Sequence, residues 1–333
     1  MENKELPLVT IIIPVLNEER HIKNCLEDIL NQNYPQDKIE VFIVDGGSKD
    51  NTIEIIRGFI KNHSSFGATI IDKIGKSISA AMNLGLKQAG GDIVVKVDAH
   101  TKYELDYVSK CVEYLGKTGA DCVGGPIRPK GTNYLSQAIS LALKTSFGSG
   151  GGKFHREDYE GYADTVYLGA YKKEVLKKIG GWDERIIDED EDLNYRLRKS
   201  GSKIYLIPKI KSYYYVYPTI KKIWSLYFEY GYSKVFFIKK HRILGSWHHI
   251  IPSVFVSGLM GSFLLGFIFW PLRVLFILIL GPYLIISFLV SVQISLKHGL
   301  KYFPVLPIIF VILHLSYGIG FLKGIFNTFS IKE

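Results

Sequence analysis

The stretch GGDIVVKVDAH, residues 90–100, ends a run of β-branched apolar residues in two side chains that can bind a metal, Asp98 and His100. If the strand continues through Ala99, these side chains lie on one face, because alternate residues of a strand point the same way. A carboxylate with an imidazole suits Mn²⁺ somewhat better than Mg²⁺, which prefers oxygen ligands. The stretch alone leaves two interpretations open, a metal site and a polar turn.

A second polar stretch, DGGS at residues 45–48, follows an apolar strand directly. Asp45 can accept hydrogen bonds from a ribose or a base, and the small residues after it let a ligand approach the backbone. The alternative is a turn whose glycines take positive φ. Neither the P-loop pattern GxxxxGK[ST] nor a dinucleotide-binding GxGxxG after a strand is present.

The third candidate is the acidic run DEDED, residues 188–192. Adjacent carboxylates repel one another and are costly unless a cation, a helix N-terminus or a reacting group uses them. An acid at the rim of a cleft among like charges has a raised pKa and can accept a proton, an effect worth about 10²- to 10⁴-fold in rate. Some of the acids would only favour the helix start.

The elements that precede these residues predict an α/β fold. Apolar strands alternate with amphipathic helical patterns, which is typical of a mostly parallel sheet covered by helices on both faces. Ligands of such sheets lie beyond the carboxyl ends of the strands. Asn17 and Glu18, Asp45, and Asp98 with His100 should therefore meet along one edge. Strands are expected from residue 8 to a stop at Pro14 and over 39–45, 68–73 and 93–98, helices over 20–32, 53–63 and 77–90, and a strand followed by a helix over 165–184.

The C-terminal third is apolar enough to enter a membrane. The 333 residues contain 47% hydrophobic residues, which is high for a soluble protein. A helix needs roughly 20 apolar residues to cross a bilayer core of about 30 Å. Lys297, His298 and Lys301 predict a cytosolic loop by the positive-inside rule. The candidate spans are residues 250–270, 272–293 and 303–323, of which the third would either span or lie in the interface.

Many of the basic residues that give the net charge of +9 lie in one segment of the chain. Many basic residues between Lys203 and Arg242 are interleaved with aromatic residues, as in helices that lie on anionic lipid. No nucleic-acid-binding signature accompanies them, so nucleic acid is not an expected partner. Three cysteines without a CxxC predict reduced thiols, and no signal peptide pattern opens the chain. The expected domains are a cytosolic domain over 1–215, interface helices over 216–248 and two to three membrane helices over 249–333.

Five stretches, in order, resemble the inverting family-two glycosyltransferases of the GT-A fold. The likeness is closest to membrane enzymes that extend lipid-linked saccharides, including succinoglycan-type glucosyltransferases. It implies a Rossmann-like GT-A domain, Mn²⁺ or Mg²⁺ as cofactor, a UDP- or GDP-sugar donor and a lipid-linked saccharide acceptor at the cytosolic face of the cell membrane. The stretches are TIIIPVLNEE, VFIVDGGSKDNT, KSISAAMNLGLKQAGGDIVVKVDAH, LGAYKKEVLKKIGGWDE and EDEDLNYRLRKSG, which cover roughly residues 8–205.

The resemblance also implies roles for individual residues. Asp98 and His100 take the positions of the metal-binding DxD, and Asp98 thereby contacts the donor. Asp45 would bond the base or the ribose. The residues implied to line the nucleotide are Pro14, Asn17 and Glu18.

On the acceptor side, the resemblance aligns Glu189 and Asp190 with an ED pair in which Asp190 is the catalytic base. A register slip in the acidic run would make Asp192 the base instead. Trp182 and Glu189 would contact the acceptor. His100 replaces the second acid of DxD, which leaves the metal preference open, and the QxxRW of processive synthases is not evident, which favours addition of one sugar per encounter.

Two other functions remain to be distinguished. A polyprenyl-phosphate sugar synthase would use a phosphate as nucleophile and would hardly need a base. A membrane scaffold or transporter subunit with a degenerate nucleotide-binding domain would show no transfer at all.

Overall fold

The apolar strands form one eight-stranded sheet in the order β3-β2-β1-β4-β9-β6-β10-β8. The neighbours β3, β2, β1 and β4 are parallel, as are β6 and β10, whereas β9 is antiparallel to β4 and β6, and β8 to β10. The predicted mostly parallel sheet is confirmed. The strands are β1 (Val9–Val15), β2 (Ile39–Asp45), β3 (Ala68–Asp72), β4 (Ile93–Lys96), β6 (Cys122–Gly125), β8 (Gly161–Tyr162), β9 (Tyr167–Lys172) and β10 (Ile204–Leu206).

The computed structural model describes residues 5–72, 75, 77–186, 188–243 and 247–330. The chain divides into two units. The first unit contains the residues up to Arg128 and Lys153–Tyr215, and the second contains Pro129–Gly152 and the residues from Val216 onward. The sequence placed residues 129–152 in the first domain, whereas the structure groups them with the second unit.

Helices cover both faces of the sheet because successive strand residues alternate between two cores. Ile11 and Ile13 of β1 pack in one cluster with α1, α2 and α4, and Ile12 packs in the other with α3, α7 and α8. The helices are α1 (Ile22–Leu30), α2 (Thr52–Asn62), α3 (Ile78–Gln88), α4 (Tyr107–Thr118), α7 (Lys173–Lys178) and α8 (Glu189–Lys199), with short 3₁₀ turns η1 (Gln36–Lys38) and η2 (Lys153–His155).

Strand β1 continues through Pro14 to Val15, so the predicted stop at the proline is wrong. Pro14 is paired in register with Val44 of β2. On the other side, β4 pairs with β1 only as far as Ile12, whose carbonyl accepts from the N–H of Val97. The backbone nitrogen of Pro14, two residues later, points to the same side of β1 as the Ile12 carbonyl, beyond the last residue pair of β1 and β4. A proline is tolerated there because no neighbouring strand requires its missing N–H.

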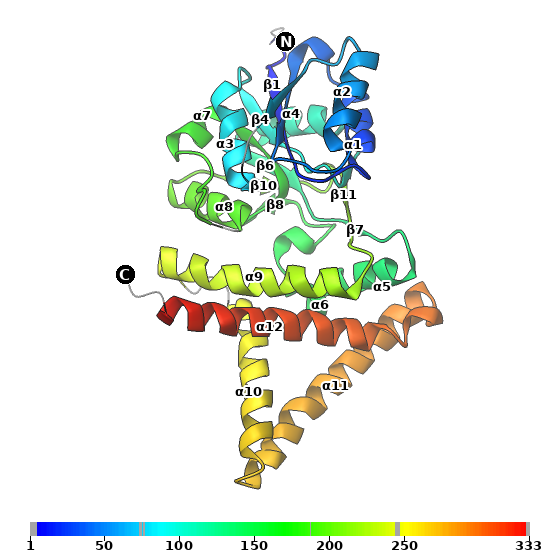
Figure 1. Cartoon of the computed structure of the whole chain (residues 1–333), viewed down its shortest axis with the longest axis vertical. Coiled ribbons are helices and arrows are strands. Elements are labelled where there is room, and N and C mark those ends of the chain that lie inside the picture. The colour runs from blue at the N-terminus through cyan, green and yellow to red at the C-terminus, as the bar shows by residue number, and fades with distance from the viewer. Residues whose placement is uncertain (1–4, 73–74, 76, 187, 244–246, 331–333) are drawn as a thin grey trace. The chain divides into compact units, whose positions relative to one another are not determined.

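The second unit is mainly helical, and α9 and α12 lie side by side in it (Figure 1). A Cβ atom at Gly231 of α9 would lie 2.0 Å from the carbonyl oxygen of Tyr317, and one at Gly320 of α12 would lie 2.0 Å from that of Phe228. Glycine thus permits direct backbone contact between the two helices. The elements are β7 (Pro129–Lys130), α5 (Tyr134–Leu143), α6 (Ser146–Ser149), α9 (Ile220–His241), η3 (Trp247–His249), α10 (Ile251–Leu265), α11 (Pro271–His298), η4 (Leu300–Tyr302) and α12 (Leu306–Ser330).

Among the described residues, two helices are long and apolar enough to cross a membrane, α11 and residues Leu306–Asn327 of α12. Helix α10 has 15 residues. At a rise of 1.5 Å per residue it is about 22 Å long, shorter than a bilayer core of about 30 Å. All three apolar segments are therefore helical, but only two have the length of a span.

Candidate active site

The turn after β4 presents Asp98 and His100. Strand β4 ends at Lys96, and the backbone turns at Ala99 and His100 before β5 (Thr101–Tyr103) begins. The strand was predicted to end at Asp98 and ends two residues earlier. The condition that it continues through Ala99 is not met, because the N–H of Thr101 donates back to the carbonyl of Asp98 (3.2 Å). The Tyr103 hydroxyl accepts from the Asp98 N–H (2.8 Å) and donates to its carbonyl (3.3 Å). A fixed turn, rather than strand alternation, places Asp98.

The loop after β1 reaches this turn through Glu18. Its Oε1 lies 3.3 Å from Nδ1 of His100, which makes a carboxylate–imidazole pair between the ends of two neighbouring parallel strands. Burial lowers the pKa of His100, but the hydrogen bond to Glu18 and the charge of Asp98 outweigh it and raise the pKa above its usual value. The structure thus brings Glu18, Asp98 and His100 to the edge where the sequence placed them.

The loops after β1 and β2 are joined around Asp45 and Ser48. The buried Asp45 carboxylate accepts from the N–H groups of Gly47 (3.1 Å) and Ser48 (3.1 Å) and from the Ser48 hydroxyl (2.6 Å). The Ser48 Oγ accepts from the N–H of Asn17 (2.9 Å), whose side-chain oxygen accepts from the N–H of Lys49 (2.8 Å). Asn17 has φ 57°, in the left-handed region that asparagine tolerates. Asp45 and Asn17 therefore shape the loops at this edge.

Lys96, the last residue of β4, is a functional candidate that sequence reasoning missed. Its side chain is 3% exposed, and Nζ lies 2.9 Å from Oε1 of Glu189 and 2.6 Å from Oδ2 of Asp190. Burial lowers the pKa of Lys96, but the charges of Asp190 and Glu189 raise it well above its usual value. The available signal was a lysine inside the apolar run DIVVKV, because a buried strand position rarely holds an unpaired charge.

The two acids bound by Lys96 begin α8 and differ in their surroundings. The Glu189 side chain is 12% exposed, and burial raises its pKa although Lys96 opposes the shift. The Asp190 side chain is 34% exposed. Its Oδ1 is shielded from solvent and has no hydrogen-bond donor among the described residues. A buried acceptor without a donor costs about 1–3 kcal/mol, so this atom requires an explanation.

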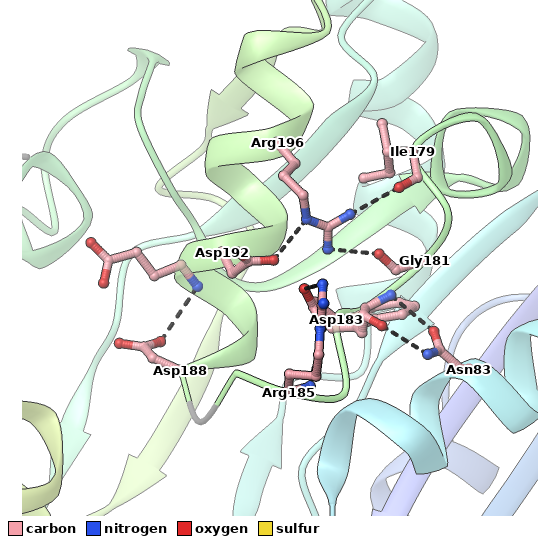
Figure 2. Close-up of polar contacts among 10 residues, drawn as sticks. Asn83, Ile179, Gly181, Asp183, Arg185, Asp188, Asp192 and Arg196 are labelled. Carbon is pink, nitrogen blue, oxygen red and sulfur yellow. Dashed lines mark hydrogen bonds and ion pairs between the residues drawn. The ribbon is translucent and has the colours of Figure 1, made fainter. Parts of the chain in front are cut away.

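Asp192, the rival base, is paired with Arg196 of the same helix (Figure 2). It is fully buried, and its Oδ2 accepts from Nε of Arg196 at 2.7 Å. Arg196 also donates to the carbonyl oxygens of Ile179 (2.9 Å) and Gly181 (2.7 Å). Asp192 therefore holds an arginine that fastens α8 to the turn after α7.

Trp182 lies in the core, although the sequence predicted that it contacts the acceptor. It is 2% exposed, and its ring meets that of Tyr171 edge-on at 6.1 Å. Its backbone N–H donates to Oδ1 of Asn83 (2.8 Å), and its carbonyl accepts from Nδ2 of the same residue (2.8 Å). The side chain is not on an open surface, so this placement gives the predicted acceptor contact no support.

Comparison with known families agrees with this geometry. A model of glycosyl transferase family 2 matches residues 10–180, slightly more than half of the chain. The chain belongs to this family. It is therefore a glycosyltransferase, and transfer in this family inverts the configuration at the anomeric carbon. The predicted family and enzyme class are confirmed.

Two relatives resemble this glycosyltransferase over nearly its whole length. It is 28% identical over 324 residues to the dolichyl N-acetyl-alpha-D-glucosaminyl phosphate 3-beta-D-2,3-diacetamido-2,3-dideoxy-beta-D-glucuronosyltransferase of Methanococcus voltae, covering 95% of this chain and 97% of that protein. It is 29% identical over 321 residues to the succinoglycan biosynthesis protein ExoA of Rhizobium meliloti (strain 1021), covering 95% and 94%.

Solved structures of low sequence identity share the fold. The mannosyltransferase PcManGT from Pyrobaculum calidifontis, in complex with GDP-Man and Mn²⁺, superposes with a TM-score of 0.64 at 19% identity and covers 96% of this chain and 88% of its own. S. aureus TarS 1-349 in complex with UDP-GlcNAc gives 0.53 at 16% identity, covering 96% and 92%. The predicted GT-A fold is confirmed.

The turn after β4 in this glycosyltransferase carries donor groups that fit a divalent cation. Across the described ranges, no group of three or more His, Cys, Asp or Glu side chains could hold a metal alone. Asp98 and His100 offer one carboxylate and one imidazole, which suits Mn²⁺. A metal-bound histidine typically donates its other ring N–H to a carboxylate, and His100 has such a partner in Glu18.

Proposed function

We propose that this glycosyltransferase moves a sugar from a UDP- or GDP-sugar to a saccharide carried on a membrane lipid, with Asp190 as the catalytic base. The contrast within the acidic run carries the proposal. The Asp190 side chain is 34% exposed, and its Oδ1, although shielded from solvent, has no donor among the described residues, whereas Asp192 is fully buried against Arg196. A base must be reachable by the hydroxyl that it deprotonates, and Asp190 meets this condition better.

The donor is proposed to lie at the edge formed by the ends of β1, β2 and β4, where ligands of open α/β sheets bind. Asp45 would bond the ribose or the base, and the residues lining the nucleotide would be Pro14, Asn17 and Glu18. Two structural neighbours carry GDP-Man and UDP-GlcNAc, which supports a sugar attached to a nucleoside diphosphate.

The acceptor proposal draws on the relatives and on the apolar helices. One relative is named for transfer to a dolichyl-phosphate-linked sugar and the other for succinoglycan biosynthesis. Helices α11 and α12 have the length and composition to anchor the chain. Lys297, His298 and Lys301 lie between them, so by the positive-inside rule this loop faces the cytosol. The first unit faces the same side when α10 and α11 enter and leave the membrane together as a hairpin. We therefore place the enzyme in the cell membrane, as a multi-pass protein with its catalytic unit in the cytoplasm.

In the proposed reaction, the acceptor hydroxyl oxygen attacks the anomeric carbon from the face opposite the nucleotide. The bond between that carbon and the diphosphate oxygen breaks, its electron pair leaves with the nucleotide, and the hydroxyl proton passes to Asp190. Asp98 and His100 would hold Mn²⁺ or Mg²⁺, which supplies positive charge for the leaving diphosphate when bound. Contact of Glu189 with the acceptor stays a prediction.

The test uses the full chain in nanodiscs with GDP- and UDP-sugars, Mn²⁺ or Mg²⁺, and two acceptors, a polyprenyl-diphosphate saccharide and a polyprenyl phosphate. We expect Asp190→Asn to lower kcat by about 10²- to 10⁴-fold, because it removes the proton acceptor, and to leave donor binding unchanged. The control is Asp188→Asn in the same acidic run, since the Asp188 side chain caps α8 and asparagine caps a helix equally well.

Other results would reject the proposal. Full activity of D190N with polyprenyl phosphate as acceptor would identify a polyprenyl-phosphate sugar synthase, whose nucleophile is already ionised. Failure of the wild type to transfer or hydrolyse any nucleotide sugar with Mn²⁺ would revive the scaffold interpretation.

A further inference from the structure

Lys96 occupies a position where a charged side chain is unusual. Strand β4 lies between β1 and β9 in the sheet, and the Lys96 side chain is 3% exposed. A buried ammonium group is costly unless anionic partners with good geometry neutralise it. An apolar residue would fill a strand position at lower cost. The partners of Lys96 must therefore explain why a lysine is here.

Both partners come from the first turn of α8, more than ninety residues away in the chain. The ammonium group donates to Oε1 of Glu189 at 2.9 Å and to Oδ2 of Asp190 at 2.6 Å. The two carboxylates are neighbours in sequence and repel each other. One shared cation offsets this repulsion and holds both acids against the sheet.

Lys96 also connects these acids to the turn that bears Asp98 and His100. It is the last residue of β4 and stands two residues before Asp98. The Tyr103 hydroxyl fixes the backbone of Asp98, so little chain freedom separates Lys96 from that turn. Reacting groups are held most accurately when rigid strands or helices and their hydrogen bonds support them.

We propose that Lys96 is a positioning residue of the transfer reaction: by binding Oδ2, it fixes the Asp190 carboxylate relative to the turn at Asp98 and His100. The inference rests on the proposed role of Asp190 as base. Without Lys96, the carboxylate rotates about its side-chain bonds and repulsion from Glu189 displaces it. A displacement of about 1 Å in such a group costs on the order of 10²-fold in rate.

The experiment compares Lys96→Met and Lys96→Arg in the wild-type and D190N backgrounds. K96M should lower kcat by roughly 10²-fold with the donor KM nearly unchanged, because the donor still binds but the Asp190 carboxylate is no longer held in position. K96R keeps a cation between the two acids and should recover roughly tenfold of that loss. In the D190N background K96M should cost less than about threefold, since residues that act together are not additive.

The matched control is Lys172→Met. Lys172 ends β9, and its Nζ lies 3.1 Å from Oδ1 of Asp121, so it is another strand lysine paired with an acid. Neither residue belongs to the site. K172M should leave kcat unchanged. If K96M fails to show cooperative thermal unfolding, K96M/E189Q removes one buried acid charge with the cation, and its kcat is compared with that of E189Q.

Three results would overturn the inference. One is a kcat of K96M equal to that of the wild type, and another is an equal loss in the wild-type and D190N backgrounds. The third is a K96R variant no more active than K96M. If D190N is inactive and K96M is active, only the inference on Lys96 fails. If D190N is fully active, the proposed base fails and this inference fails with it.

Discussion

Asp190 and Asp192 stand two residues apart on one helix and have opposite surroundings. Helix residues are spaced by about 100°, so the two side chains point to different sides of α8. Asp190 meets Lys96 of the sheet, is partly exposed and keeps one oxygen without a donor among the described residues. Asp192 meets Arg196, is fully buried and takes part in a network that reaches two backbone carbonyls.

The difference lies in the cations as much as in the acids. A guanidinium presents five donors in a planar fork, and Arg196 uses three of its N–H groups to bind Asp192 and the carbonyls of Ile179 and Gly181. Lys96 is a compact charge shared by two carboxylates. A satisfied polar network stabilises a fold, whereas an acceptor left over costs stability and is expected where a substrate supplies the donor. This contrast supports a structural role for Asp192 with Arg196 and the proposed catalytic role for Asp190 with Lys96.

The largest effect, a loss of stability, should come from breaking the ion pair between Asp192 and Arg196. Asp192→Asn removes the charge that compensates Arg196, and loss of one partner of a buried pair typically lowers the free energy of unfolding by about 3 kcal/mol or more. Thermal unfolding of the purified chain should show a lower Tm. The control is Asp164→Asn, since the ion pair of Asp164 with Arg198 is exposed and is worth less than about 1 kcal/mol. A D192N protein with wild-type Tm and a kcat reduced about 10²-fold would reverse the two roles.

A second experiment separates donor binding, proposed for Asp98, from proton transfer, proposed for Asp190. Mn²⁺ with a nucleotide sugar at 100 times its Kd should stabilise the wild type by about 2.7 kcal/mol. Asp98→Asn should abolish this metal-dependent gain, because it weakens the only carboxylate proposed to bind the metal directly. D190N should keep the gain and lose turnover. Equal stabilisation of D98N and the wild type would remove Asp98 from donor binding.

Much of the fold could be predicted from the sequence, because it depends on local patterns of apolar and polar residues. Unbroken apolar strands between amphipathic helices predicted a parallel sheet, and the rule for strand ends placed Glu18, Asp98 and His100 at one edge. The choice between the two acids was partly readable as well. Arg196 follows Asp192 by four residues, the spacing of neighbours on one helix face, and so marks Asp192 as paired.

The sequence alone did not predict the contacts between distant segments or the exact ends of the strands. Lys96 and Asp190 are separated by 94 residues, and no periodicity connects them. The turn at Ala99 depends on the Tyr103 hydroxyl, and the strand that continues through Pro14 depends on where its neighbour stops. Trp182 was expected at the acceptor, but burial against Tyr171 is decided by tertiary packing.

The smallest expected effect concerns Asp188, which precedes both of the compared acids. Its side chain accepts from the N–H of Glu191 at 3.4 Å and caps the start of α8 (Figure 2). Asp188→Ala should lower the free energy of unfolding by about 1 kcal/mol, while Asp188→Asn should retain the cap and the stability. Neither variant should change kcat, because a cap contributes to the helix and not to proton transfer. A large loss of kcat in D188N at unchanged Tm would mean that the reacting acid lies one turn earlier than Asp192 and that Lys96 holds the wrong pair.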